Sequence, residues 1–382
     1  MPFKEFTTMS QRLEFVLLAS AEDANIRLLC RRFSISPTTG YKWLRRYLSS
    51  GSLGLQELSR RPQHSPRRTD SDLEQSVCLL RQQHPAWGGR KLHARLLALG
   101  HSHVPSPSTI TAILRRNQLI DPIVSESHKP FIRFQHPKPN DLWQIDFKGD
   151  FPLRRGRCYP LTVIDDHSRF VLGLVACDNL RASTTQSALE RVFRRYGLPY
   201  RMTMDNGAPW GTVRGQDSRW TKLTVWLLRL GIRVSHSRPH HPQTQGKDER
   251  FHRTLNLELL RGRAWRTTEE CQKEFDRWLQ VYNCQRPHEA LQMDVPASRY
   301  QPSARAFPEE LLAIEYGEGY IVRKVDKRGE ISYKNGDYFI GTAFKGMRVG
   351  LRATSKKEEM EVYFLHQKIG KIDLKTGAVD HQ

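Results

Sequence analysis

Three acidic residues stand in positions where an ionised side chain needs a compensating charge. Asp146 lies in the middle of a short apolar segment, and Asp205 ends another such segment just before an Asn-Gly pair. Both segments are typical of short β-strands that end at turns. Glu249 lies early in a long helical pattern that opens after Pro242. Because an uncompensated carboxylate inside a strand is costly, the fold must supply a partner for these charges.

Divalent metal ions would supply this compensation. Mg²⁺ binds oxygen ligands and needs only a few protein carboxylates beside water and phosphate. Two such ions about 3.5–4 Å apart can contact both the attacking and the leaving oxygen of an in-line phosphoryl displacement. The sequence therefore predicts a nuclease-type active site with two Mg²⁺ (or Mn²⁺) ions near Asp146, Asp205 and Glu249.

The residues alone leave alternatives at some of these positions. Asp205 precedes Asn-Gly, where an aspartate is also an ordinary turn former. On the predicted helix, Asp248 points into the middle of the apolar face and Glu249 lies further round, so periodicity does not choose between them. Asp165 and Asp166 stand at the end of a predicted strand, where we expect them to shape a hairpin.

The sequence resembles a known family at five segments that follow one another in the family's order. These segments are Trp143-Gln144-Ile145-Asp146-Phe147, Val163-Ile164-Asp165-Asp166-His167-Ser168-Arg169, Asp205-Asn206-Gly207, the stretch from Ser237 to Leu255, and Tyr282-Asn283-Cys284-Gln285-Arg286-Pro287-His288. The family is that of insertion-sequence transposases of the DDE type, whose catalytic domain is the retroviral-integrase form of the ribonuclease H fold. The resemblance covers roughly residues 130–300.

The resemblance implies which acids bind the metal ions. The family's Gly-Lys-x-Glu-Arg text aligns with residues 246–250, so Glu249 becomes the third ligand beside Asp146 and Asp205. One departure concerns the spacing: the interval from Asp205 to Glu249 is longer than the one from which the wider family takes its name. The surplus falls in the loop Gly207–Trp220, where an insertion costs little.

The order of the predicted elements indicates a multidomain chain. All-α helix-turn-helix modules precede a central α/β ribonuclease H-like core, and a small all-β domain, similar to the SH3-like barrels of transposases and integrases, follows it. We expect a helix-turn-helix domain at 1–50, a basic linker at 51–69, a second helix-turn-helix domain at 70–120, a Pro-rich linker at 121–140, the catalytic core at 141–300 and the SH3-like β-barrel at 315–376.

Basic residues in four places are candidates for DNA contact. A recognition helix that begins at Pro37 would enter the major groove, the linker would follow the backbone, and the second module and the helix at 246–255 would contact phosphates. In each place, the alternative is a solvated basic surface. The candidates are Thr38, Thr39, Lys42, Arg45, Arg46, Arg60, Arg61, Arg67, Arg68, Arg90, Lys91, Arg115, Arg116, Lys247, Arg250 and Arg253.

The charge balance agrees with a nucleic-acid partner. The chain has 61 Lys and Arg against 40 Asp and Glu, which gives a formal net charge of +21, and such an excess favours a polyanionic partner. It has no apolar run of membrane-spanning length, no signal-peptide pattern, and six scattered cysteines. We therefore expect no membrane partner and a cytoplasmic, nucleoid-associated location in a bacterial host.

These features together predict a DNA transposase. It would bind double-stranded DNA at the terminal inverted repeats of a mobile element, cut the strands, and join them to target DNA by transesterification. The family suggests a homodimer or a higher oligomer on DNA. Two alternatives stay open: a transposase-derived DNA-binding regulator without catalysis, and a ribonuclease H-type nuclease without strand transfer.

Overall fold

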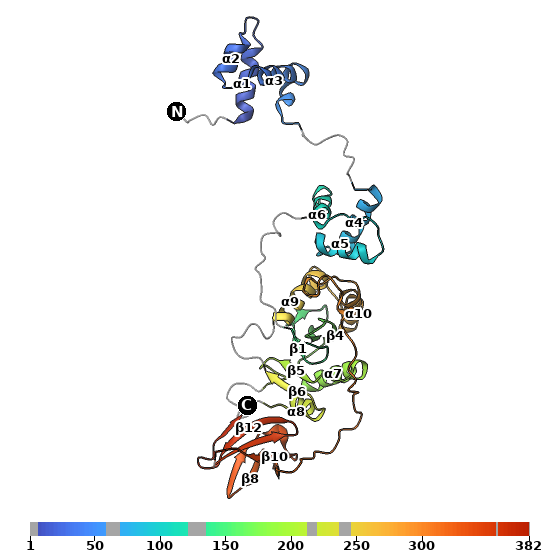
Figure 1. Ribbon diagram of the computed structural model, residues 1–382, viewed down its shortest axis with the longest axis vertical. Helices are drawn as coiled ribbons and strands as arrows, with labels where there is room; N and C mark the ends of the chain where they lie inside the picture. The colour runs from blue at the N-terminus through green and yellow to red at the C-terminus, as the bar shows by residue number, and fades with distance from the viewer. Residues whose placement is uncertain are drawn as a thin grey trace. The chain divides into compact units, whose positions relative to one another are not determined.

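The computed structural model describes residues 7–58, 69–120, 135–211, 220–236, 246–356 and 358–381. The chain divides into two compact units, Met1–Arg68 and Thr69–Gln382, whose elements are labelled in Figure 1. The predicted loop at 207–220 and the predicted segment at 237–245 lie largely outside the described residues.

The first unit is a bundle of short helices. They are α1 (Thr8–Ala19), α2 (Ile26–Arg32), α3 (Pro37–Ser50) and the 3-10 helix η1 (Gly51–Leu55). Ser36 caps α3 through the amide of Thr39, and Pro37 occupies the first turn, where its missing N–H is harmless. Phe15, Val16 and Trp43 form the core.

The predicted linker at 51–69 begins inside the helical domain. Leu55 is fully buried in the core of the first unit, and its carbonyl accepts a hydrogen bond of 3.0 Å from Arg12. Residues 51–55 therefore belong to the helical domain. The predicted linker at 121–140 extends too far, because Asn140 is buried and its backbone amide donates to Asp165 in the core at 2.8 Å.

The second unit begins with three helices, α4 (Ser71–Gln83), α5 (Gly89–Ala98) and α6 (Pro107–Arg116). Their apolar faces enclose Val77, Trp87 and Ile110. At Gly89 an added Cβ would lie 2.4 Å from the carbonyl oxygen of Pro107. The close approach of α5 to α6 therefore requires glycine at this position.

A mixed sheet forms the centre of the second unit. Its strand order is β2-β3-β1-β5-β6, with β4 also paired to β3. β1 runs antiparallel to β3 and parallel to β5, and β5 runs parallel to β6. This is the ribonuclease H arrangement that the sequence predicts, with a two-residue strand β2 in addition. The strands are β1 (Trp143–Phe147), β2 (Phe151–Pro152), β3 (Arg157–Asp165), β4 (Val171–Cys177), β5 (Arg201–Met204) and β6 (Arg233–His236).

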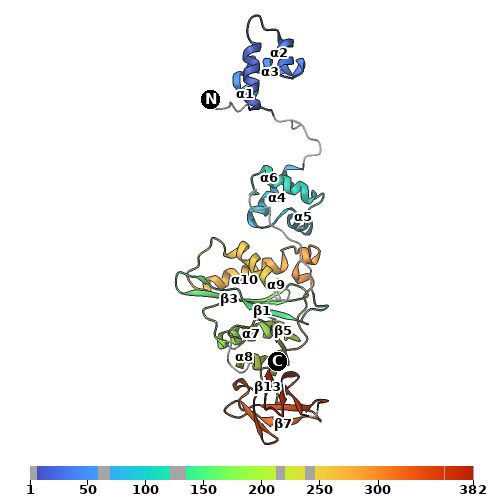
Figure 2. The same cartoon turned by 90° about the vertical axis from the view of Figure 1, so that its left-hand side faces the viewer.

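Helices cover both faces of this sheet, as Figure 2 shows. On one face, α7 (Ala182–Tyr196) and α8 (Lys222–Arg229) pack around Trp143 and Phe193. On the other face lie α9 (Gly246–Leu255), a π-helical turn (Asn256–Leu260) and α10 (Thr268–Cys284), which pack around Phe251 and Phe275. The two layers fix α9 beside the sheet.

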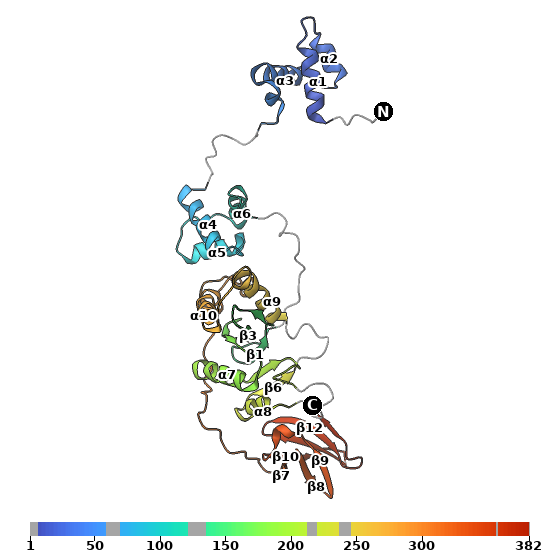
Figure 3. The same cartoon turned by 180° about the vertical axis from the view of Figure 1, so that it is seen from behind.

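The C-terminal part is all-β, as predicted, and its strands gather in one small domain (Figure 3). A five-stranded sheet has the order β13-β12-β11-β10-β7, and β8 pairs with β9. An SH3-like closure of these strands stays a prediction. The strands are β7 (Ile321–Lys324), β8 (Glu330–Tyr333), β9 (Gly336–Phe339), β10 (Arg348–Ala353), β11 (Glu359–Phe364), β12 (Gln367–Asp373) and β13 (Val379–His381).

The β-domain shares its core with the catalytic domain. The ring of Trp220, just before α8, lies 6.1 Å from that of Phe344, and its indole N–H donates to the carbonyl of Ile369 at 3.5 Å.

Within the described residues, no helix is both long and apolar enough to cross a membrane.

Candidate active site

Asp146 lies near the end of β1, and Asp205 directly follows β5, the neighbouring parallel strand. In the parallel pair of β1 and β5, Trp143 lies opposite Met202, and each aspartate follows its member of this pair by three residues. Because side chains alternate along a strand, equal steps from a matched pair lead to the same side of the sheet. The two carboxylates therefore meet at the carboxyl ends of β1 and β5.

The negative charge of Asp205 disfavours ionisation of the Asp146 carboxyl group. Burial, the neighbouring Asp205 and, to a smaller extent, Glu249 raise the pKa of Asp146 to about 7. The amide of Phe147 donates to Asp146 at 2.8 Å and offsets part of this shift. Burial also raises the pKa of Asp205, which accepts a hydrogen bond of 3.1 Å from the amide of Gly207. The site thus concentrates negative charge in a partly buried place.

Helix α9 brings two further acids to this place. Glu249 is exposed, whereas Asp248 is only 1% exposed. Within the described residues, Oδ1 of Asp248 is buried and has no hydrogen-bond partner. Burial, followed by the charges of Asp146 and Asp166, raises the pKa of Asp248 well above its ordinary value. Both acids of α9 therefore act electrostatically on Asp146, and Asp248 is the one that points inward.

The described residues are only partly arranged for metal binding. Across them, no group of three or more His, Cys, Asp or Glu side chains is placed so that it could hold a metal ion. The chemistry of the donors nevertheless fits a divalent cation, because carboxylate oxygens are the ligands that Mg²⁺ prefers. Oδ1 of Asp248, which has no hydrogen-bond partner among the described residues, and the neighbouring acids would be compatible with a bound cation.

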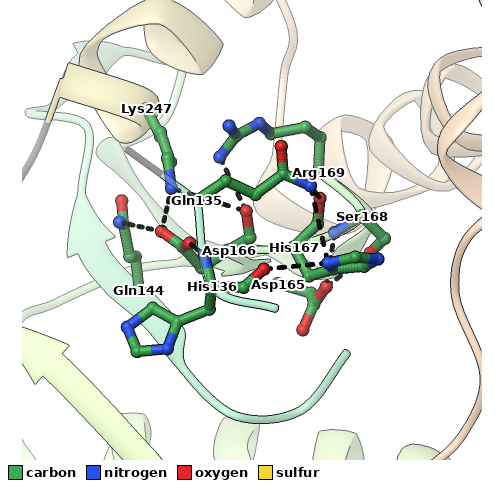
Figure 4. A network of polar contacts seen from close by, with 9 residues as sticks. All are labelled: Gln135, His136, Gln144, Asp165, Asp166, His167, Ser168, Arg169 and Lys247. Carbon is green, nitrogen blue, oxygen red and sulfur yellow. Dashed lines mark hydrogen bonds and ion pairs between the residues drawn. The ribbon is translucent and has the colours of Figure 1, made fainter. Parts of the chain in front are cut away.

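A buried ion pair fixes the start of α9, as Figure 4 shows. The amino group of Lys247 pairs with Oδ1 of Asp166, which also accepts from Gln144 at 2.9 Å. The other oxygen of Asp166 accepts from the amide of His136 at 2.8 Å. Oδ1 of Asp165 accepts hydrogen bonds from the backbone amide and from the hydroxyl of Ser168. Asp165 and Asp166 thus shape the turn between β3 and β4, as expected, and Asp166 also holds α9.

Comparisons with protein families match nearly every domain of the chain. Residues 136–242 and 230–296 each match a family described as "Integrase core domain". Residues 320–380 match "IS481 family transposase, C-terminal domain". Residues 11–63 match "Helix-turn-helix domain", and residues 39–114 match "Homeodomain-like domain".

A curated relative points the same way. The chain is 28% identical over 171 residues to the "Insertion element IS407 uncharacterized 31.7 kDa protein" of Burkholderia multivorans, a match that covers 44% of this chain and 59% of that protein. The chain belongs to the insertion-sequence transposases with an integrase-type core. The matched region of the transposase thus spans less than two thirds of this relative.

Viral proteins are similar to the same region. The transposase is 26% identical over 175 residues to the Gag-Pol polyprotein of koala retrovirus, which covers 43% of the chain and 10% of the polyprotein. Among solved structures, the magnesium complex of the HTLV-2 integrase catalytic core aligns at 14% identity and a TM-score of 0.32, covering 44% of this chain and 100% of that chain. A simian T-cell lymphotropic virus intasome structure aligns at 15% identity and a TM-score of 0.35, covering 76% and 97%.

Thr162 connects the backbone of Asp146 to α9, a contact that the sequence does not predict. The hydroxyl of Thr162 donates to the carbonyl of Asp146 at 3.0 Å and lies 3.0 Å from Nε2 of His252. Burial, followed by the nearby Lys148, lowers the pKa of His252 to about 4. A neutral His252 therefore links α9 to β3 and β1. The pairing of Asp146 with Thr162 across β1 and β3 is a tertiary feature that no local pattern signals.

The structure places the candidate DNA contacts of the first unit on α3. Thr38 and Thr39 lie in its first turn, and Lys42 and Arg45 are exposed. The guanidinium of Arg46 lies 5.1 Å from the centre of the Trp43 ring. Their contact with DNA stays a prediction. The linker candidates Arg60, Arg61, Arg67 and Arg68 lie outside the described residues.

The candidates of the second unit differ in their surroundings. Three form ion pairs within the protein: Lys247 with Asp166, Arg116 with Glu74 at 2.7 Å, and Arg90 with Glu289 at 3.7 Å. Burial lowers the pKa of a fourth, Lys91, to about 8. Arg115, Arg250 and Arg253 are exposed. Contact of all these residues with DNA stays a prediction.

Proposed function

We propose that this transposase binds double-stranded DNA at the ends of its mobile element, cleaves the strands in a metal-dependent reaction, and transfers them into target DNA. The observation that carries the proposal is the equivalent placement of Asp146 and Asp205 at the ends of two paired parallel strands. Two carboxylates on one side of a sheet edge, with further acids on a neighbouring helix, suit phosphoryl transfer assisted by two metal ions.

In this proposal, Asp146, Asp205 and Glu249 hold two Mg²⁺ (or Mn²⁺) ions. When bound, the ions supply the positive charge that activates water or a DNA 3′-hydroxyl and stabilises the leaving oxygen. Water as the nucleophile gives nicking of the end, and the 3′-hydroxyl gives strand transfer. In the described residues these acids are not grouped as a metal site, and bound ions would supply the charge that lets the carboxylates come close together.

The third ligand has a specific rival. Asp248 is buried next to Asp146 and has an oxygen without a partner among the described residues, whereas Glu249 is the residue that matches the family text. We assign the metal to Glu249 because a ligand must also reach DNA at the surface. In this assignment, Asp248 adds negative charge behind the ions.

The other residues of the site orient these acids. Lys247 anchors the first turn of α9 to Asp166 and so fixes which acids face the sheet. Thr162 holds the backbone of Asp146 and contacts His252 on α9. The helix-turn-helix domains would read the ends, the β-domain would adopt an SH3-like barrel, and synapsis of two ends would require a dimer or a higher oligomer.

The test uses purified full-length protein, Mg²⁺ and labelled DNA that contains the flanking ends of the element. We expect end-specific nicking and joining by the wild-type protein, loss of both in Glu249→Gln, and retention of both in Asp248→Asn. Activity that survives Glu249→Gln but fails in Asp248→Asn would make Asp248 the ligand. End binding without any metal-dependent cleavage would leave a regulator, and nicking without joining would leave a nuclease.

A further inference from the structure

A cationic hollow lies at the opposite end of the same strands from the acids. Its volume is about 640 Å³. It opens where β5 and β6 begin, four residues before Asp205 along β5, which is roughly 13 Å at the rise of a strand. The basic side chains that line it are Arg201, Arg233, Arg305, His136 and His366.

Two of these arginines, Arg201 and Arg233, lie opposite each other on neighbouring strands. Arg201 and Arg233 are register partners in the parallel pair of β5 and β6, so their side chains lie on the same side of the sheet. Both are exposed, and in the described parts of the chain neither side chain takes part in a hydrogen bond or an ion pair. Like charges directly opposite each other on neighbouring strands are unfavourable, so this pair would gain from a bound anion.

A third arginine is held in place by the backbone. Arg305 donates to the carbonyls of Leu230 and Gly231 at 3.1 and 3.0 Å. Gly231 has a φ of +72°, and a Cβ there would lie 2.9 Å from the guanidinium. The charge of Arg305 is therefore fixed at the wall of the hollow before any ligand arrives, which reduces the ordering cost of binding.

The remaining lining residues do not cancel this charge. Burial, followed by the charge of Arg233, lowers the pKa of His366, and a hydrogen bond with the backbone of Ile232 opposes part of this shift. Asp141 also lines the hollow, but it forms no ion pair with a cation among the described residues. Three arginines against one aspartate leave the hollow positive.

We propose that this hollow binds a backbone phosphate of the DNA duplex, with Arg201 and Arg233 as its direct contacts. Guanidinium groups bind phosphate through paired charge-assisted hydrogen bonds. The hollow is open and much larger than one phosphate ion, which suits a phosphate that is part of a chain. The proposal rests on the proposed function for the identity of the ligand, and it adds a DNA contact that is separate from the acids and from the helix-turn-helix domains.

The test compares two charge-matched double variants of the full-length protein. Arg201→Gln/Arg233→Gln removes the pair, and Arg191→Gln/Arg277→Gln removes two exposed arginines from α7 and α10. Duplex affinity is measured at several salt concentrations. For the first variant, we expect the slope of log affinity against log salt to shrink by about 1, because the one lost phosphate contact contributes about 0.9. The control variant should keep the wild-type slope, and equal slopes in the two double variants would overturn the proposal.

A second measurement identifies the source of the phosphate. Modification of Arg201 and Arg233 by a dicarbonyl reagent is followed by mass spectrometry in the presence of duplex DNA or of inorganic phosphate. We expect duplex to protect both arginines at phosphate concentrations where inorganic phosphate does not. Protection by inorganic phosphate alone would mean a free-anion site and would refute the assignment to DNA.

The two proposals fail in different ways. Metal-dependent cleavage by the wild-type protein is measured in parallel with binding. One outcome is a reduced salt slope in Arg201→Gln/Arg233→Gln together with no cleavage by the wild-type protein. It would refute the transposase activity and keep the hollow as a DNA contact. Wild-type cleavage with an unchanged slope would refute the hollow alone.

Discussion

Asp146 and Asp205 each stand three residues beyond the matched pair Trp143 and Met202 on neighbouring parallel strands. The pairing of β1 with β5 thus brings the two residues to the same end of the sheet. The charge of Asp205 acts on Asp146: after burial, it is the largest cause that raises the pKa of Asp146. Two acids at the carboxyl ends of neighbouring strands would suit a divalent cation, because carboxylate oxygens are the ligands that Mg²⁺ prefers.

This arrangement predicts a pH-dependent cost to stability. The folded pKa of Asp146, about 7, lies above its ordinary value of 3.8, so the folded protein binds this proton more tightly than the unfolded chain does. Stability is therefore lost as pH rises from about 4 to about 7. Asp146→Asn lacks this loss and should exceed the wild type in unfolding free energy by on the order of 2–4 kcal/mol above pH 7.

Urea denaturation at pH 4.5 and at pH 8 measures this difference. The gain of Asp146→Asn should be small at the lower pH and should grow at the higher pH. Mg²⁺ should stabilise the wild type at pH 8 and so narrow the gap, since only the wild type keeps all the acids that would bind it. A gap that is the same at both pH values would show that Asp146 titrates normally.

The ion pair of Lys247 and Asp166 predicts a second effect. Lys247→Met leaves Asp166 buried with only Gln144 and the His136 amide as donors, and removal of one partner from a buried pair is strongly destabilising. We expect a loss of about 2–4 kcal/mol in unfolding free energy, together with a loss of metal-dependent cleavage.

The matched control is Arg277→Met, which removes an exposed cation paired with Glu274 on α10. Exposed pairs contribute little, so this variant should lose less than about 1 kcal/mol. Chemical denaturation of both variants gives the comparison. Equal losses would mean that the pair at Asp166 is no more important than a surface contact.

Gly89 predicts a packing effect in the second helical module. Gly89→Ala places a methyl group 2.4 Å from the carbonyl of Pro107 in the unadjusted structure, so α5 and α6 must separate. Overpacking of this kind costs about 1–3 kcal/mol. Gly88→Ala is the control, because a Cβ at Gly88 meets nothing within 4 Å. Thermal unfolding that is shifted equally in both variants would argue against close packing of α5 on α6.

The sheet and the first two acids could be predicted from the sequence because they depend on local patterns. The segment around Asp146 is apolar and short, and Asp205 precedes a turn, so their strands follow from hydrophobic periodicity. The resemblance to the family then placed the strands in order. The helices of both helical modules follow from caps such as Ser36 and Ser106.

Features that depend on tertiary contacts could not be predicted in this way. The inward turn of Lys247 depends on Asp166, which lies in another part of the chain. Helical periodicity left Asp248 and Glu249 open, and the burial of Asp248 became visible only in the packed structure. The Arg, Pro and Ser content of residues 51–69 predicts a linker, yet the core of the first unit buries Leu55.

The central claim is that Asp146 and Asp205 act as one metal-binding unit, and the most direct test is a double-mutant cycle on end cleavage. Rates are measured with Mg²⁺ for the wild type, Asp146→Asn, Asp205→Asn and the double variant, with folding checked by circular dichroism. Residues that act as a unit have strongly non-additive effects, so both single variants and the double variant should fall to the same low rate. Substantial cleavage in either single variant, or losses that multiply in the double variant, would contradict the claim.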